Sequence, residues 1–292
     1  MAPVLFLSHG TTMMLGTDSR TRDYWAALGR DALAHGVKGV IIMGAHWNTP
    51  DNSIHVSTNP SPSVMPISNT DPTLWSTWKP NPDLETSHRV ISLLRSRGFT
   101  VDPDPNFTWM IDTVPLLIGM FGREDCCPPV TIISQNTHWD PFTHARIGAA
   151  LRHLRAERYL LIGSGGGVHN LYLTEWKYML QYKDNFAMER PPVWQTLEFR
   201  QSLEDVIVRN GGGPELRRGI TRLMKHPYFR DAHGTDEHFV SACFVAGAVS
   251  GIEDRELRGR LGAEVWELRS QCESQFCLGE WPSEWLQPAA EE

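Results

Sequence analysis

Three short apolar runs that each lead to a histidine are the feature that most constrains this chain. Residues 4–6 run into Leu7-Ser8-His9, residues 40–43 into Gly44-Ala45-His46, and residues 159–162 into a glycine cluster and His169. Short apolar runs bounded by glycine and polar residues are typical of buried strands. Segments with helical spacing of apolar residues lie between them, and this alternation predicts an α/β layered fold.

The pattern predicts a single three-layer domain over residues 1–287, with a central mixed sheet flanked by helices, and a disordered tail at 288–292. Six prolines between residues 59 and 82 predict a long ordered loop or lid. Ser19 is expected to cap one helix, and Gly36 and Gly98 to end helices. The expected strands are 3–8, 38–45, 53–57, 129–134 and 158–163, and the expected helices are 20–35, 83–97 and 143–156, with mostly helical structure beyond Val193.

Composition excludes several classes of protein. The formal charge of -7, without any long basic run, argues against a nucleic-acid or anionic-membrane partner. The chain has neither a secretory signal nor an apolar stretch of transmembrane length, so we expect a cytoplasmic protein. The cysteines are odd in number and lack CxxC spacing, which favours reduced thiols. Nothing here distinguishes a monomer from a homodimer.

The histidines predict where the chemistry lies. Open α/β sheets bind ligands at the carboxyl ends of their strands, and His9, His46 and His169 all follow predicted strands. An imidazole held on a rigid element suits a metal ligand or a proton shuttle. Any one of them alone is equally well explained as a hydrogen-bonded structural histidine. Three in the same topological position favour a common metal-centred pocket.

The glycine cluster at residues 163–167 has two other interpretations. A phosphate-binding loop would need the GxxxxGK[ST] lysine or GxGxxG spacing at a helix start, and both are missing. Ser164 as a nucleophile would need GxSxG, but glycine stands immediately on both sides of it. We therefore interpret the cluster as a turn that lets His169 approach a ligand closely.

A fourth histidine follows in the stretch from His233 to Phe239. Thr235 or Asp236 is a suitable cap for a helix running to about residue 249, which would place His238 in its first turn and facing the cleft. Glu237 is equally available as the ligand, giving a site with two histidines and one carboxylate. The sequence leaves this choice open, and His233 and Glu237 are further candidates for orienting the ligands.

These residues resemble a known family, the class III extradiol ring-cleaving dioxygenases, in the DOPA-dioxygenase-like branch of the protocatechuate 4,5-dioxygenase catalytic-subunit superfamily. The resemblance runs over most of the chain, and the order and spacing of its motifs are specific. The motifs are Ser8-His9-Gly10, Gly44-Ala45-His46-Trp47, Asp140-Pro141 leading to Leu151-Arg152-His153-Leu154-Arg155, Gly163-Ser164-Gly165-Gly166 with His169-Asn170-Leu171, and Asp236-Glu237-His238 before Gly247-Ala248.

The resemblance implies an α/β domain with a mononuclear non-haem Fe(II), although some members are recovered with zinc. It implies that His9 and His46 are metal ligands, that His238 is the third, and that His169 is the acid/base histidine. The implied reaction opens the ring of a catechol-like or aminophenol-like aromatic with dioxygen. Its partners would therefore be a small aromatic substrate and O2.

The chain departs from the family at a segment that bears on the substrate. Relatives carry Asp-His-Gly ahead of Val-Pro-Leu, but here Thr113 follows Asp112 and cannot carry a proton as imidazolium does. His138 is a candidate to compensate by position. Trp47 and Trp109 are candidates for an aromatic pocket wall. These changes, with Thr11-Thr12 replacing a family proline, favour a non-standard aromatic substrate.

Three functions remain open. The leading one is a ring-opening dioxygenase. The second is a zinc hydrolase in which the same histidines hold an ion that activates water, so oxygen consumption separates the two. The third is a catalytically silent member of the superfamily that uses the cleft as a binding module. Loss of the Asp-His-Gly histidine supports this third reading, whereas retention of His9, His46, His169 and His238 opposes it.

Overall fold

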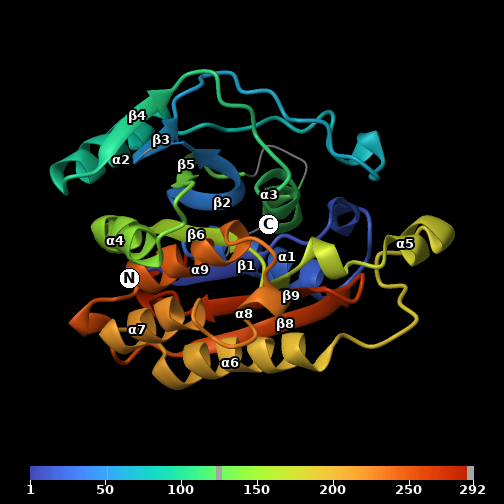
Figure 1. The fold of residues 1–292 in the computed structure, drawn as a ribbon. Helices are drawn as coiled ribbons and strands as arrows, with labels where there is room; N and C mark the ends of the chain where they lie inside the picture. The colour runs from blue at the N-terminus through green and yellow to red at the C-terminus, as the bar shows by residue number, and fades with distance from the viewer. Residues whose placement is uncertain (51, 123–126, 288–292) are drawn as a thin grey trace.

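A mixed sheet of nine strands forms the centre of the molecule, in the order β4-β3-β5-β2-β6-β1-β9-β7 with β8 paired to β9 (Figure 1). The computed structural model describes residues 1–50, 52–122 and 127–287, so the predicted tail at 288–292 lies outside it. The strands are β1 (Val4–Ser8), β2 (Gly39–Thr49), β3 (Ser53–Ser57), β4 (Thr100–Asp104), β5 (Val130–Asn136), β6 (Tyr159–Gly165), β7 (Val168–His169), β8 (Gly259–Glu267) and β9 (Gln271–Leu278).

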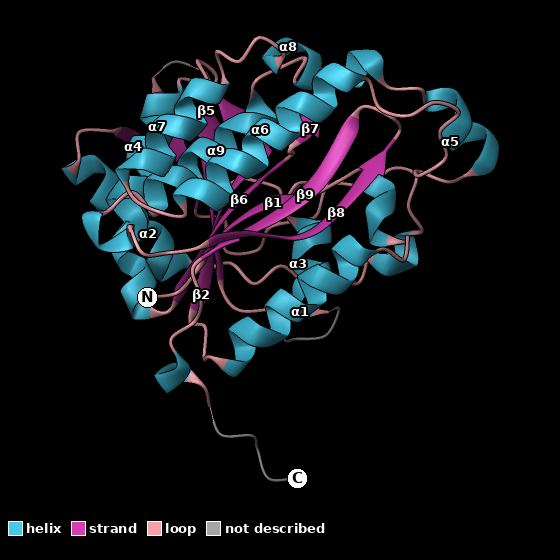
Figure 2. Ribbon diagram, turned by 90° about the horizontal axis from the view of Figure 1, so that it is seen from below, coloured by secondary structure: helices cyan, strands magenta, loops and turns pink. Residues whose placement is uncertain are grey.

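Helices cover both faces of this sheet, and the predicted three-layer α/β architecture is confirmed. In Figure 2, α4, α6, α7 and α9 lie on one side of the strands, and α1 and α3 lie on the other. The helices are α1 (Arg20–Ala34), α2 (Leu84–Ser96), α3 (Val114–Phe121), α4 (Pro141–Leu151), α5 (Trp176–Tyr182), α6 (Trp194–Asn210), α7 (Pro214–Leu223), α8 (Phe229–Ala232) and α9 (Glu237–Ala248).

The strand sequences are apolar on both faces because successive side chains enter two different cores. Val4 and Phe6 of β1 pack into the core formed with α2, α4, α6, α7 and α9. Leu5 and Leu7 pack into the core formed with α1 and α3. Side chains alternate across a strand, so only a continuous apolar run can fill both cores.

The four central strands run parallel, and their carboxyl ends therefore meet at one edge of the sheet. β2 pairs in parallel with β5 and β6, and β1 pairs in parallel with β6. The register of β2 on β5 shifts between Met43 and Asn48, which is the stretch that contains His46. Such irregularities re-aim side chains near the ends of strands.

Glycines in β6 let α9 approach the sheet very closely. A Cβ on Gly163 would lie 2.4 Å from the Ser241 carbonyl oxygen, and one on Gly165 would lie 2.0 Å from the His238 carbonyl oxygen. The glycine cluster was expected to admit His169. Its tightest contacts are instead with the helix that carries His238, because a helix backbone can pack this close only where the strand has no side chain.

Most of the expected elements are confirmed, including the Ser19 cap, whose side chain accepts from the Arg22 amide. The expectation of mostly helical structure beyond Val193 is confirmed as far as Ala248, through α6 to α9, but it was wrong after that, since β8 and β9 form a hairpin there. All eight residues of β9 are buried, although half of them are polar. A buried strand with this composition lacks the apolar run by which strands are recognised.

His144 on α4 is a buried, neutral histidine that makes the fold sensitive to acid. Its Nδ1 donates to the Asp140 carbonyl at 2.7 Å, and its Nε2 accepts from the Asn136 amide at 3.2 Å. Burial lowers its pKa to about 4. Protonation of Nε2 would remove the acceptor that the Asn136 amide uses.

We predict that His144→Gln flattens the pH dependence of stability. Between about pH 6.5 and pH 4 the unfolded histidine binds a proton that the folded one does not, so the free energy of unfolding falls as pH falls. Urea unfolding should show that, between pH 7.5 and pH 4.5, the free energy of unfolding falls by roughly 2 kcal/mol more in the wild type than in the variant. His88→Gln, at an exposed position of α2, is the control and should behave like the wild type. Parallel curves for the wild type and His144→Gln would contradict the prediction.

Candidate metal centre

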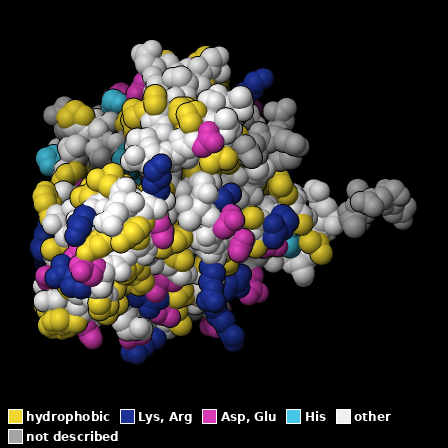
Figure 3. Space-filling view, turned by 90° about the vertical axis from the view of Figure 1, so that its right-hand side faces the viewer, with side chains coloured by type: hydrophobic (Ala, Val, Ile, Leu, Met, Phe, Trp, Pro, Cys, Tyr) yellow, Lys and Arg dark blue, Asp and Glu magenta, His cyan; other side chains and the backbone are white. Residues whose placement is uncertain are grey.

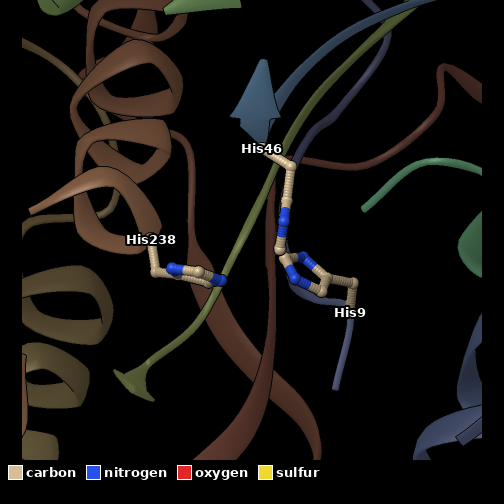
Figure 4. A group of neighbouring side chains, drawn as sticks. All are labelled: His9, His46 and His238. Carbon is tan, nitrogen blue, oxygen red and sulfur yellow. The ribbon is translucent and has the colours of Figure 1, made fainter. Parts of the chain in front are cut away.

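Three histidines from distant parts of the chain converge at the carboxyl edge of the sheet. His9 follows β1, His46 lies in β2 and His238 lies in the first turn of α9. Each pair of ring centroids is 5.2 Å apart, and the ligand atoms all lie within 4.8 Å of one another. Figure 4 shows the three side chains pointing toward a common space. Three imidazoles in this arrangement could hold a divalent cation.

The protonation of the His9 ring is set by a hydrogen-bond chain. Ser164 Oγ donates its only hydrogen to the carbonyl of Asp112. The contact between His9 Nδ1 and Ser164 Oγ, at 3.1 Å, is therefore donated by the imidazole. Because Nδ1 carries the hydrogen, Nε2 keeps its lone pair, which is the form that binds a metal.

His238 is oriented by its neighbour in the sequence. Its Nδ1 donates to Glu237 Oε1 at 3.0 Å, and Thr235 Oγ1 donates to the same oxygen at 2.6 Å. His238 Nε2 is buried and has no hydrogen-bond partner among the described residues. A buried lone pair without a donor is a poor arrangement unless a cation or ligand is bound there.

The expected helix cap is only partly present. Asp236 is the N-cap of α9, but its side chain makes no capping hydrogen bond and pairs with Arg230 instead. The Glu237 carboxylate lies within 4.8 Å of the ligand atoms of His169 and His238, so a second possible metal-binding group exists beside the first. Its Oε1 is already used by two donors, which favours an orienting role.

Burial keeps the imidazoles of His9 and His238 neutral. Desolvation lowers the pKa of His9 and of His238 well below the usual value, and the neighbouring histidines lower each pKa further. A protonated ring at either position would lose water and face another positive charge. Neutral imidazole is the form that binds metal, so the residues present fit a divalent ion.

Asp112 connects two of the strands that carry this centre. Its carboxylate accepts from the His46 amide at 2.8 Å, and its carbonyl accepts from Ser164. A Cβ on Gly44 would lie 2.0 Å from Asp112 Oδ2, so the carboxylate needs glycine at that position. Asp112 was not among the predicted site residues, although its segment was noted for the altered Asp-His-Gly motif.

His169 lies directly beside the three histidines. Its ring is stacked on that of His238, with centroids 3.4 Å apart and planes inclined by 10°. His169 Nδ1 has no hydrogen-bond partner among the described residues, and burial lowers the pKa of the ring to about 4. His233 lies behind it, where Nε2 donates to the Gly167 carbonyl at 3.2 Å. His233 therefore supports the strand that carries His169.

A cavity of about 190 Å³ opens beside the histidines. It is smaller than the pockets of roughly 300–1,000 Å³ that hold drug-sized ligands, so it fits a single aromatic ring. Besides the four histidines, its lining residues are Gly10, Thr11, Thr12, Ser68, Asn69, Ile111, Leu171, Trp176, Met179 and Gln271. Ser68 and Asn69 come from the proline-rich loop, which thus forms part of the wall as expected of a lid.

The four residues expected to contact substrate do not line this cavity. Trp47 stacks on Phe107, with centroids 3.8 Å apart. Trp109 is fully buried, and Thr113 donates to the carbonyl of Met110. His138 is exposed and lines a different hollow.

The aromatic wall comes instead from Trp176 of α5, which sequence reasoning missed. That short segment showed no apolar periodicity and no motif, so only its place in the folded chain reveals the contact.

A pair of buried carboxyl groups holds the loop that follows His9. Glu267 accepts from the Thr11 amide at 2.9 Å and from the Thr11 hydroxyl at 2.7 Å, and it also accepts from Asn185. Burial raises the pKa of Glu267, and it raises that of Glu273 well above the usual range, helped by the neighbouring Glu267 charge. Glu273 is therefore the protonated member and donates to Glu267, while it accepts from the Gly10 amide.

Comparison with known proteins decides the family. A family model described as "Catalytic LigB subunit of aromatic ring-opening dioxygenase" matches residues 3–267. The chain belongs to this family. A protein from Escherichia coli K12, named "4,5-DOPA dioxygenase extradiol", is 25% identical over 256 residues, or 86% of each chain. No helix within the described residues is long and apolar enough to cross a membrane.

Plant relatives and a solved structure agree with this assignment. The proteins named "4,5-DOPA dioxygenase extradiol" from Beta vulgaris and Portulaca grandiflora are 29% and 28% identical. The matches cover 86% and 91% of this chain, and 88% and 95% of theirs. The crystal structure of an uncharacterized Escherichia coli K12 protein covers 96% of this chain and 100% of its own, with a TM-score of 0.70 at 20% identity. The last comparison supports the LigB fold alone.

Ser164→Ala should weaken metal binding without unfolding the protein. Loss of the Ser164 hydroxyl leaves His9 free to change tautomer and to rotate, and loss of such an orienting partner typically costs 10–100-fold in affinity. A Zn²⁺ titration against a chromophoric chelator measures the change. Ser134→Ala is the control, since Ser134 is also fully buried but accepts from the His55 amide on the far side of β2. Equal Zn²⁺ affinity in Ser164→Ala and the wild type would contradict the tautomer argument.

Glu273→Gln should be tolerated, whereas Glu267→Gln should destabilise the protein. An amide at 273 keeps one donor for Glu267 and one acceptor for the Gly10 amide. An amide at 267 replaces a charged acceptor of several hydrogen bonds and should cost about 1–3 kcal/mol in the free energy of unfolding at pH 7. Urea unfolding measures both.

The carboxyl pair of Glu267 and Glu273 should also make the free energy of unfolding depend on pH. A carboxyl group with a raised folded pKa loses its stabilising contribution as pH rises from about 4.3 through that pKa. Glu273→Gln should remove this loss. Equal destabilisation by the two substitutions would show that the proton is not held as inferred.

Proposed function

We propose that this LigB-family protein is a metal-dependent extradiol dioxygenase that opens the ring of a catechol-like or aminophenol-like aromatic with O2. One observation carries the proposal: the ligand atoms of three imidazoles lie within 4.8 Å of one another beside a cavity of single-ring size. The names of the family and of the relatives support ring opening in general.

Fe(II) is the proposed metal, held by His9, His46 and His238. Imidazole ligands suit iron and zinc, and three protein ligands leave positions open for other molecules. Such an ion, when bound, would acidify a substrate hydroxyl and bring the aromatic and dioxygen together. His46 is the exposed member of the three, and all three histidines line the cavity.

His169 is proposed to move the proton. Its ring lies against His238, and Nδ1 has no protein partner among the described residues. Because burial keeps the ring neutral, this nitrogen is available to accept the proton of a substrate hydroxyl that binds in the cavity lined by the four histidines. The same nitrogen can return the proton when the ring opens.

A zinc hydrolase is the alternative, because a ligand set of three imidazoles and no carboxylate also occurs in zinc enzymes that activate water. A catalytically silent binding module is the third possibility, supported by Thr113 in place of the family histidine. Oxygen uptake distinguishes the dioxygenase from both.

Anaerobic reconstitution with Fe(II), followed by oxygen-electrode and absorbance assays on catechols and aminophenols, tests the proposal. We expect oxygen uptake that matches formation of a coloured ring-opened product. His46→Ala should lose the metal, measured by elemental analysis. His169→Ala should keep the metal and lose at least about a hundredfold in turnover, because a general acid–base group is removed.

His138→Ala serves as the control and should retain activity, since His138 lines a different hollow. Metal retained in His46→Ala but lost in His169→Ala would overturn the assigned roles. Hydrolysis by the zinc-loaded protein without any oxygen uptake would overturn the dioxygenase.

A further inference from the structure

We propose that the substrate of this site carries an uncharged, apolar ring substituent and no carboxylate. This inference rests on the proposed function and names the class of aromatic that the cavity selects. It follows from the chemistry of the cavity wall. Beyond the histidines, the wall is apolar at Ile111, Leu171, Trp176 and Met179, and its remaining side chains are neutral hydroxyl and amide groups.

The cavity offers no counter-ion for a carboxylate. Among the described residues that line it, none is a lysine or an arginine. Arginines on the surrounding segments are engaged, since Arg230 pairs with Asp236, and Arg190 and Arg269 both pair with Glu175. Lys177, which follows Trp176 on α5, is exposed, with its ammonium 5.1 Å from the centroid of the Tyr178 ring, and does not line the cavity. A carboxylate removed from water without a cationic partner pays a large desolvation penalty.

The substituent meets the apolar side of the cavity. In the proposed binding the ring hydroxyls face the histidines, so the substituent points away from them and toward Leu171, Trp176 and Met179. A carboxylate there would lose its water against apolar side chains that cannot replace it.

The apolar wall continues to the surface along α5. Leu171 is 48% exposed and Trp176 is 42% exposed, and both line the cavity. Figure 1 shows α5 projecting from one side of the molecule, and Figure 3 views that side, where hydrophobic side chains gather. A cavity of single-ring size with an apolar mouth therefore suits one ring inside and an alkyl or aryl group at the opening.

Binding to the zinc-loaded protein tests the inference without turnover. Tryptophan fluorescence titration should give a dissociation constant for 4-methylcatechol at least about tenfold lower than that for 3,4-dihydroxybenzoate. The two ligands share the diol and differ in the charge of one substituent. Equal or tighter binding of the carboxylate would overturn the inference, and so would failure of both to bind.

A charge placed in the wall should change the preference. Leu171→Arg puts a cation at the cavity mouth and should reduce the preference for 4-methylcatechol at least about fivefold. Leu180→Arg is the matched control on α5, where Leu180 is 69% exposed and does not line the cavity. It should leave the preference unchanged. An equal shift in both variants would mean that the charge acts from a distance, and this would overturn the role of the wall.

Oxygen uptake by the Fe(II) protein separates the two proposals. Uptake with 3,4-dihydroxybenzoate in preference to 4-methylcatechol would support the dioxygenase and overturn the inference about the substituent. Tighter binding of 4-methylcatechol without oxygen uptake from any catechol would support the apolar selectivity of the cavity and overturn the dioxygenase.

Discussion

The close contact between α9 and β6 is the constraint on which the candidate metal centre depends. A side chain at Gly163 or Gly165 would collide with the backbone of α9, so the helix can pack this closely only because the strand has no side chains at these two positions. His238 lies in the first turn of that helix, and the distance of its ring from His9 and His46 is set by this packing. Core packing therefore also determines the geometry of the site. Protein interiors are packed as densely as crystals of small organic molecules, so one element cannot shift without moving its neighbours.

Buried polar groups make the site rigid. Ser164 and Asp112 link β6 to the histidines of β1 and β2, and Glu237 fixes the ring of His238. The contacts of Ser164 and Glu237 set which nitrogen carries the hydrogen in His9 and in His238, whereas Asp112 holds the backbone of His46. Preorganisation of this kind reduces the cost of ordering the ligands when the metal enters.

The candidate metal ligands and the apolar side of the cavity come from different segments of the chain. Thr113, expected to contact substrate, is buried away from the cavity. Leu171, Trp176 and Met179 form the apolar side of the cavity. Residues in this wall can therefore differ without any change in the histidines, because ligand-holding and wall residues lie in different parts of the site.

The sequence by itself determined the α/β class, the strands that lead to His9 and His46, and the helix that carries His238 in its first turn, since apolar periodicity and glycine boundaries are local signals. Its family motifs also predicted which histidines would meet. Only the tertiary structure decided the polar strand β9, the carboxyl pair of Glu267 and Glu273, and the wall contributed by α5. Those features depend on partners far away in the chain. From the sequence alone a polar residue is predicted to be exposed, and it can be buried only where another segment supplies its hydrogen bond.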